Sequence, residues 1–152
     1  MAIRNIIQIG DETLRKKSFP VTDFGEKTHT LIDDMRDTLF KADGAGIAAP
    51  QIGVLRRIFI VSAEDKYFEC VNPVITEAKG RQVGEEACLS VRGKQGVVER
   101  PMKITVKAQD RYGKPFTVKA SGFLARAFCH EYDHLDGILY VDKAKSVGEE
   151  EN

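Results

Sequence analysis

The chain has 152 residues, of which 42% are hydrophobic and 30% charged, a composition that excludes collagen-like, low-complexity and wholly disordered proteins. Its 23 basic residues balance 23 acidic ones, so no net charge draws it to nucleic acid or to anionic lipid. It has no apolar run near the ~20 residues of a membrane-spanning helix, and its start lacks the order of a signal peptide. We therefore expect one cytoplasmic domain over residues 1–142 and a disordered acidic tail over residues 143–152.

The first predicted element is an amphipathic helix over residues 26–42. Leu31, Met35 and Leu39 recur every four residues, which places them on one face of a helix. We expect this helix to end at residues 43–44, where Gly44 can adopt the left-handed conformation that closes many helices.

Six short segments follow that are rich in Val, Ile and Phe and are separated by Gly, Pro, Asn and Asp, a pattern that predicts strands. They are residues 57–61, 68–71, 83–87, 97–99, 104–108 and 116–120. The last two alternate apolar and polar residues, and residues 110–114 between them have the composition of a tight turn. These two segments therefore predict an antiparallel hairpin.

The final predicted element is a second helix over residues 121–135, with Ser121 as its N-cap. Leu124, Phe128 and Leu135 recur at helical spacing within it. A helix, several strands and a second helix in this order favour an α+β fold over alternating βαβ units. We expect antiparallel β-sheets packed around this C-terminal helix, with one N-terminal amphipathic helix.

The second helix contains His130-Glu131-Tyr132-Asp133-His134, the H-E-x-x-H pattern. Histidines four residues apart lie on one face of a helix, ~6 Å apart along its axis, so both imidazoles can bind one metal ion. Glu131 then lies next to the metal, where a general base for water would act. The pattern alone leaves open an exposed helix face whose polar residues contact only water.

Two histidines fill only half of a catalytic metal site, which usually has three protein ligands and one open position. Tyr140 occupies the position where a metzincin would have its third histidine, which excludes that ligand set. The downstream glutamates lie in the expected tail, and His29 lies among the polar neighbours of the first helix. The third ligand is therefore expected among the cysteines.

Of the three cysteines, Cys88 suits this role best. Cys129 precedes His130 and so points ~100° away from it around the helix. Cys70 lies in an apolar strand, as a small buried residue would. Cys88 stands at the end of a predicted strand beside polar residues, where its thiolate can face a cleft. We predict a metal site made of Cys88, His130 and His134, which makes the C-terminal helix the metal-binding helix.

Three segments resemble, in order and spacing, the signature motifs of the peptide deformylase family. They are Gly44-Ala45-Gly46-Ile47-Ala48-Ala49-Pro50-Gln51, Glu86-Ala87-Cys88-Leu89-Ser90 and His130-Glu131-Tyr132-Asp133-His134-Leu135. The resemblance extends over most of the chain, to residues 10–15, 71–73 and 99–101. Three ordered motifs are far more specific than the helix pattern alone.

The resemblance implies a metal-dependent hydrolase that removes the N-formyl group from the N-terminal formyl-methionine of nascent polypeptides and releases formate. Glu131 would act as the general base, while the side chain of Gln51 and the backbone N–H of Leu89 would stabilise the oxyanion. The residues that bind the substrate would be Gly46, Ile47, Phe123 and Ala127. The three predicted ligands would hold one divalent metal ion, Fe(II) in the cell, with Zn, Ni or Co in the purified protein.

The implied partners are the formyl-methionyl peptides of nascent chains and, transiently, the ribosome, with no nucleic-acid specificity and no membrane. The chain is expected to act as a monomer. It departs from the family at Ala87, where the second motif usually has glycine, and a left-handed backbone there would cost alanine roughly 1 kcal/mol. Two alternative functions remain, a catalytically weakened deformylase-like protein that binds peptides and a zinc endopeptidase.

Overall fold

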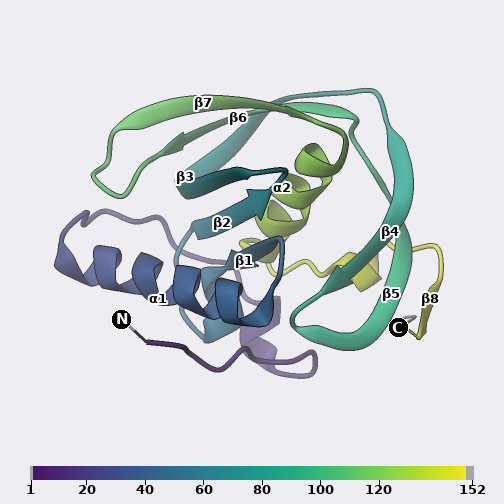
Figure 1. The fold of residues 1–152 in the computed structure, drawn as a ribbon, viewed down its shortest axis with the longest axis horizontal. Coiled ribbons are helices and arrows are strands. Elements are labelled where there is room, and N and C mark those ends of the chain that lie inside the picture. Colours follow the sequence, from purple (N-terminus) through teal and green to yellow (C-terminus); the bar gives the residue numbers. More distant parts are fainter. Residues whose placement is uncertain (1, 150–152) are drawn as a thin grey trace.

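The computed structural model describes residues 2–149, which form two antiparallel sheets around a central helix, α2 (Figure 1). The sheets have the strand orders β1-β2-β3-β6-β7 and β4-β5-β8. The strands are β1 (Gly46–Ala48), β2 (Ile58–Ala63), β3 (Lys66–Lys79), β4 (Gln82–Cys88), β5 (Val91–Arg100), β6 (Lys103–Gln109), β7 (Pro115–Ser121) and β8 (Val147–Glu149). The helices are α1 (Glu26–Ala42) and α2 (Gly122–His134), with short 3-10 helices at Glu12–Arg15 (η1), Ala49–Ile52 (η2) and Tyr140–Asp142 (η3).

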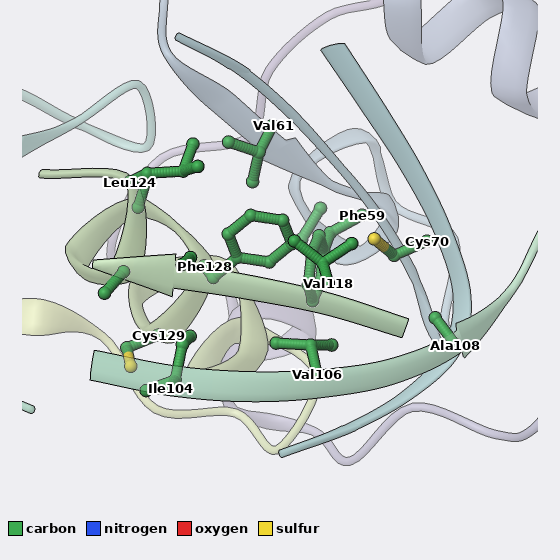
Figure 2. Close-up of a cluster of buried hydrophobic side chains, with 14 of the residues drawn as sticks. Phe59, Val61, Cys70, Ile104, Val106, Ala108, Val118, Leu124, Phe128 and Cys129 are labelled. Atoms are coloured by element: carbon green, nitrogen blue, oxygen red, sulfur yellow. The ribbon is translucent and has the colours of Figure 1, made fainter. Parts of the chain in front are cut away.

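The two long helices pack on opposite faces of the five-stranded sheet. Successive residues of a strand point to opposite sides, so Ile58 and Ile60 of β2 are buried against α1, whereas Phe59 and Val61 are buried against α2. The rings of Phe59 and Phe128 meet edge to face with centroids 5.7 Å apart, in the core that Figure 2 shows. The continuous apolar run of β2 thus contributes side chains to two hydrophobic cores, one on each face of the sheet. Two helices packed on antiparallel sheets confirm the predicted α+β class.

α1 begins and ends at the residues that the sequence predicted, and its apolar stripe is buried against β1 and β2. The residue that closes it in the left-handed conformation is Asp43, with φ 55°, so the prediction of Gly44 for this role is wrong. Gly44 has a different constraint, because a Cβ there would lie 3.0 Å from the side chain of Leu89. Its lack of a side chain lets the end of α1 pass close to the end of β4.

β3 is much longer than the predicted segment 68–71, because the chain continues through Asn72-Pro73. Asn72 has φ 51°, and the pairing of β3 with β6 shifts register here, which is a β-bulge. The side chain of Asn72 fixes the bulge, since it accepts from the N–H of Val21 at 2.8 Å and donates to Gln109 at 2.8 Å. The bulge lets one strand curve along the whole sheet.

The last described residues form a strand in place of the expected disorder. β8 pairs with residues 94–96 of β5, and Glu149 forms an ion pair with Lys94. The prediction of a disordered tail is therefore wrong for β8, because backbone hydrogen bonding to the free edge of β5 needs no apolar side chains. Residues 150–152 of that prediction lie outside the described residues. Within residues 2–149, no helix is both long enough and apolar enough to cross a membrane.

Candidate active site

α2 holds the two histidines of its motif in fixed directions. His130 and His134 lie one helical turn apart, with ring centroids separated by 5.1 Å, and both are buried. Phe128 and other apolar residues of α2 are buried in the core with the five-stranded sheet. This packing fixes the rotation of α2 about its axis and so the direction of both imidazoles.

Cys88 reaches the histidines from the end of β4, in the other sheet. Its Sγ lies 3.3 Å from Nε2 of His134, and the ligand atoms of Cys88, His130 and His134 all lie within 4.8 Å of one another. The pairing of β4 with β5 shifts register between Glu86 and Cys88, and such a bulge changes the direction of the side chains that follow it. The structure thus brings together the three residues that the sequence suggested as ligands.

The other residues considered as ligands lie elsewhere. Cys70 and Cys129 are buried in the hydrophobic core between the five-stranded sheet and α2, where Figure 2 labels both. His29 of α1 donates from Nε2 to the backbone carbonyl of Arg111 at 2.9 Å. These three side chains have structural roles outside the cluster.

The clustered donors suit a divalent metal ion. Sγ of Cys88 accepts hydrogen bonds from the backbone N–H two residues later at 3.4 Å and from Nε2 of Gln51 at 3.6 Å, so two donors hold the sulfur in place. Nδ1 of His130 is bound to Glu86 at 2.9 Å, which leaves Nε2 to face a metal. Burial holds the pKa of His134 well below its ordinary value, in the neutral form that binds metals. One thiolate and two imidazoles fit a metal centre that keeps one position open.

Glu86 connects β4 to β5 and to α2 through charged hydrogen bonds. Its carboxylate accepts from two nitrogens of Arg100 at 2.8 and 2.9 Å and from Arg126 at 2.7 Å. Burial alone would raise the pKa of Glu86, but the hydrogen bonds from Arg100 and His130 hold it well below its usual range. Arg100 also donates to Asp133 of α2 at 2.7 Å. This buried ionic network fixes the ring of His130.

Glu131 lies next to this cluster and against Gly46 of β1. Its Oε1 is buried and has no hydrogen-bond partner among residues 2–149. Burial raises the pKa of the Glu131 carboxyl to about 7, although the neighbouring His130 lowers it in part. A carboxyl that titrates near neutral pH can both accept and return a proton, as a general base in hydrolysis must.

Gln51 flanks the same cluster from η2, and Leu89 flanks it from the turn that follows β4. The side chain of Gln51 is fixed at both ends, since Oε1 accepts from the N–H of Ala48 at 2.9 Å and Nε2 donates to Oγ of Ser90 at 3.1 Å. Leu89 lies in the turn that joins β4 to β5 and lines the adjacent cavity. Both residues therefore hold N–H groups within the region of the predicted ligands.

A cavity of about 390 Å³ opens beside His130 and Glu131, which both line it. Three of the four residues predicted to bind substrate, Gly46, Phe123 and Ala127, line it too. The expectation that the Ile47 side chain does so is wrong, because this side chain is fully buried in the cluster under α1. Neighbouring residues of β1 face opposite sides of the sheet, so Gly46 and Ile47 cannot both face the cavity.

Sequence reasoning missed two residues of the site, Glu86 and Arg126. Arg126 lines the cavity and lies one helical turn before His130, so the helical spacing could have placed it on the same face. Glu86 lies two residues before Cys88 in the same sequence motif, which is the one signal that could have drawn attention to it. Their hydrogen bonds depend on how β4 meets β5 and α2, which no spacing in the sequence reports.

Ala87 occupies the wall of the cavity without backbone strain. It lies in β4, and its backbone is extended rather than left-handed. The position therefore does not require glycine for its conformation. The effect of alanine here is limited to the space that its methyl group takes in the cavity.

The comparisons with known proteins agree with this geometry. A family model described as Polypeptide deformylase matches residues 3–150. The chain belongs to the peptide deformylase family. The peptide deformylase of Caldicellulosiruptor bescii is 52% identical over 152 residues, which cover 99% of this chain and 92% of that protein. The peptide deformylase of Halothermothrix orenii is 49% identical over 152 residues, 99% of each chain.

Solved structures of deformylases have the same fold. The peptide deformylase of Thermotoga maritima superposes with a TM-score of 0.93 at 36% identity, over 96% of this chain and all of the other. That of Legionella pneumophila has a TM-score of 0.91 at 46% identity, over 95% of this chain and 87% of the other. The resemblance seen in the motifs is thus confirmed, and the chain is an enzyme of the metallohydrolase class. None of these matches favours a zinc endopeptidase or an inactive peptide-binding relative.

Proposed function

We propose that this chain removes the formyl group from N-formyl-methionyl peptides, with release of formate, at the site formed by α2 and the end of β4. The observation that carries the proposal is the cluster of Cys88, His130 and His134, whose ligand atoms lie within 4.8 Å of one another beside a cavity that Glu131 also lines. Membership in the deformylase family supports the choice of substrate.

Cys88, His130 and His134 would hold one divalent metal ion, which when bound would polarise the formyl carbonyl and ease the ionisation of water. We propose Fe(II) as the ion in the cell and Zn, Ni or Co as ions that the purified protein can carry. The same thiolate and imidazoles suit all four ions, so cellular supply decides which one is bound.

Glu131 is proposed as the general base and acid of the reaction. Its carboxylate would take a proton from the attacking water molecule and return it to the nitrogen of the leaving amine. Its buried position beside the ligands, with Oε1 free of any hydrogen-bond partner among residues 2–149, suits both transfers. The N–H groups of the Gln51 side chain and of the Leu89 backbone would stabilise the oxyanion, at about 3 kcal/mol for each donor.

The substrate would enter along β1, where the backbone near Gly46 can pair with an extended peptide. Phe123 and Ala127 would contact the methionine side chain, since both line the cavity. The natural substrates are proposed to be nascent chains in the cytoplasm, met by a monomer in transient contact with the ribosome. The domain that does this work is proposed to span residues 1–142, with β8 added at its edge.

The test is formate release by protein purified without oxygen, with its metal content measured on the same sample. We expect formate from a formyl-methionyl peptide, and no cleavage of the same peptide without its formyl group. A Glu131→Gln variant that keeps its metal should lose nearly all turnover. Tight binding of the formylated peptide without formate would instead identify a weakened homologue, and cleavage of the unformylated peptide an endopeptidase.

A further inference from the structure

The segment before η1 runs past the two places that supply the proposed oxyanion donors. These are η2, which contains Gln51, and the turn between β4 and β5, which contains Leu89. The N–H of Ile7 donates to the carbonyl of Gln51 at 2.8 Å, and the N–H of Ile9 donates to the carbonyl of Ser90 at 2.7 Å. These bonds connect η2 to the turn between β4 and β5. One extended segment thus holds two loops that are far apart in the sequence.

Between these two backbone bonds, the side chain of Gln8 spans the turn itself. Its Nε2 donates to the carbonyl of Leu89 at 2.9 Å and to that of Ile6 at 3.2 Å, while its Oε1 accepts from the N–H of Arg92 at 3.3 Å. The side chain is only part-buried, and its apolar stem is short, so hydrophobic packing does not explain its place. A primary amide is suited to this task because it carries both donors and an acceptor.

We propose that Gln8 is a positioning residue that aims the backbone N–H of Leu89 at the oxyanion. Its bond to the Leu89 carbonyl, together with the bond from Ile9 to Ser90, fixes the two peptide groups that follow the Leu89 N–H. Without Gln8 the turn between β4 and β5 gains conformational freedom. The Leu89 N–H must then be ordered each time the transition state forms, which costs conformational entropy. The proposal rests on the proposed function, since it assigns Leu89 its role there.

The size of the effect follows from the role of the donor. Loss of a whole oxyanion donor costs about 100- to 1000-fold in kcat. Gln8 only orients a donor that remains in place, so its loss should cost less, about 5- to 20-fold. KM should change little, because the donor acts on charge that develops in the transition state.

The experiment compares four variants of the zinc-loaded protein. Gln8→Met keeps the length of the side chain without its hydrogen bonds, and Gln8→Glu keeps only the acceptor for Arg92. Gln8→His restores a donor, and Asn5→Ala is the control at an exposed residue of the same segment. The measurements are kcat, KM, zinc content, Tm and the NMR order parameter of the Leu89 N–H, which reports how freely this bond vector reorients.

We expect Gln8→Met and Gln8→Glu to lower kcat by about 5- to 20-fold with KM within about twofold, and to lower the order parameter of the Leu89 N–H from the ~0.85 of rigid backbone toward ~0.6. Zinc content and Tm should stay near those of the parent protein. Gln8→His should recover part of kcat, and Asn5→Ala should match the parent.

An unchanged order parameter of the Leu89 N–H, or a kcat within about twofold of the parent in Gln8→Met, would overturn the proposal. Parallel losses of Tm, zinc and kcat would also overturn it, because they indicate a structural role alone. If the parent protein releases no formate, the proposed function fails on its own. The Leu89 order parameters of the same variants then still decide whether Gln8 orients this N–H.

Discussion

The backbone of Gly46 lies so close to the carboxylate of Glu131, the proposed base, that a side chain at position 46 would not fit between them. A Cβ built on Gly46 would lie 2.6 Å from Oε2 of Glu131, a distance that real Cβ contacts do not reach. An alanine must therefore push the carboxylate of Glu131 away or move β1. The requirement comes from close approach rather than from an unusual backbone conformation.

The Gly46→Ala variant should lower kcat for deformylation by about 10-fold or more, since a 1 Å displacement of a reacting group is enough for losses of that size. Metal content should change little, because the three atoms nearest to the added methyl group all belong to Glu131 and none to a proposed ligand. The control is Gly148→Ala in β8, where a new Cβ meets nothing within 4 Å. A Gly46→Ala enzyme with parental kcat would refute the contact.

The raised pKa of Glu131 also makes a prediction about stability. Burial moves this pKa from an ordinary value of 4.5 to about 7 in the folded metal-free protein. The folded state then binds more protons than the unfolded state between these values, so this contribution to stability is complete below pH 4.5 and is lost as pH rises through 7. A glutamine at this position cannot ionise, so its contribution to the free energy of unfolding does not change with pH.

Glu131→Gln should therefore stabilise the metal-free protein relative to its parent at pH 8, by roughly 3 kcal/mol in the free energy of unfolding. At pH 4 the two proteins should differ little. Urea unfolding of both proteins at both pH values measures the difference, which includes the effect of the Glu131 charge on the neighbouring His130. A difference that does not change with pH would contradict a raised pKa at Glu131.

At the scale of elements, β4 is the strand on which the site depends most. It supplies Cys88 as well as Glu86, which binds Arg100 of β5 and both Arg126 and His130 of α2. Removal of one partner from a buried ionic network leaves charges that no other group compensates. The network therefore couples the geometry of a metal ligand to the pairing of two elements.

Glu86→Gln should weaken metal binding by about 10- to 100-fold, the usual effect of losing a group that orients a ligand. It should also lower the free energy of unfolding by about 3 kcal/mol or more, because Arg100 and Arg126 stay buried. Competition with a chelator and urea unfolding give the two values. Glu99→Gln, at an exposed position of β5, should change neither.

The sequence predicted α1 and three of the strands well, but it predicted only a few residues of the two longest strands, β3 and β5. The bounds of α1 agree, and the predicted strands at 83–87, 104–108 and 116–120 lie inside β4, β6 and β7. β1 and β8 have three residues each, too few for a period to show. The resemblance therefore included Ile47 among the substrate-binding residues without a strand period to show which face of the sheet its side chain is on. The predicted strand at 68–71 stops before Asn72 because no local pattern in the sequence shows that β3 continues through a bulge there.

The candidate site was predictable where only a few residues could fill a role and all but one of them could be excluded. The ligand set followed by elimination among three cysteines and three histidines, and the position of Glu131 followed from the motif. The role of Arg126 depends on Gly84, since a Cβ there would lie 3.1 Å from its guanidinium. Contacts of this kind join residues from strand and helix, so they follow from tertiary packing and not from sequence spacing.

At the scale of the whole molecule, a bound metal would join the two sheets through α2. The ligands come from β4 and from α2, and the two ligand atoms in contact, on Cys88 and His134, belong to residues 46 positions apart. Binding that exists only in the folded state adds to its stability. Metal should therefore stabilise the protein as a cross-link between distant parts of the chain.

Removal of the metal by a chelator should lower Tm by about 4 to 8 °C or more, since a loss of about 2 kcal/mol of binding free energy shifts Tm by this amount in a domain of this size. Addition of Zn should restore Tm, whereas Ca should not, because Ca prefers oxygen ligands to sulfur and nitrogen. Equal Tm values with and without metal would argue against the cluster as a binding site.

The burial of the ligands has a further consequence for how long an ion stays. His130 and His134 are buried, and Cys88 is held by hydrogen bonds from Gln51 and from the backbone of Ser90. An ion that leaves toward the cavity must first lose its bonds to β4 and to α2, and the Glu86 network holds these two elements together. The exchange of isotopically labelled zinc would measure the residence time of the metal, and so how firmly this network keeps the ligands in place.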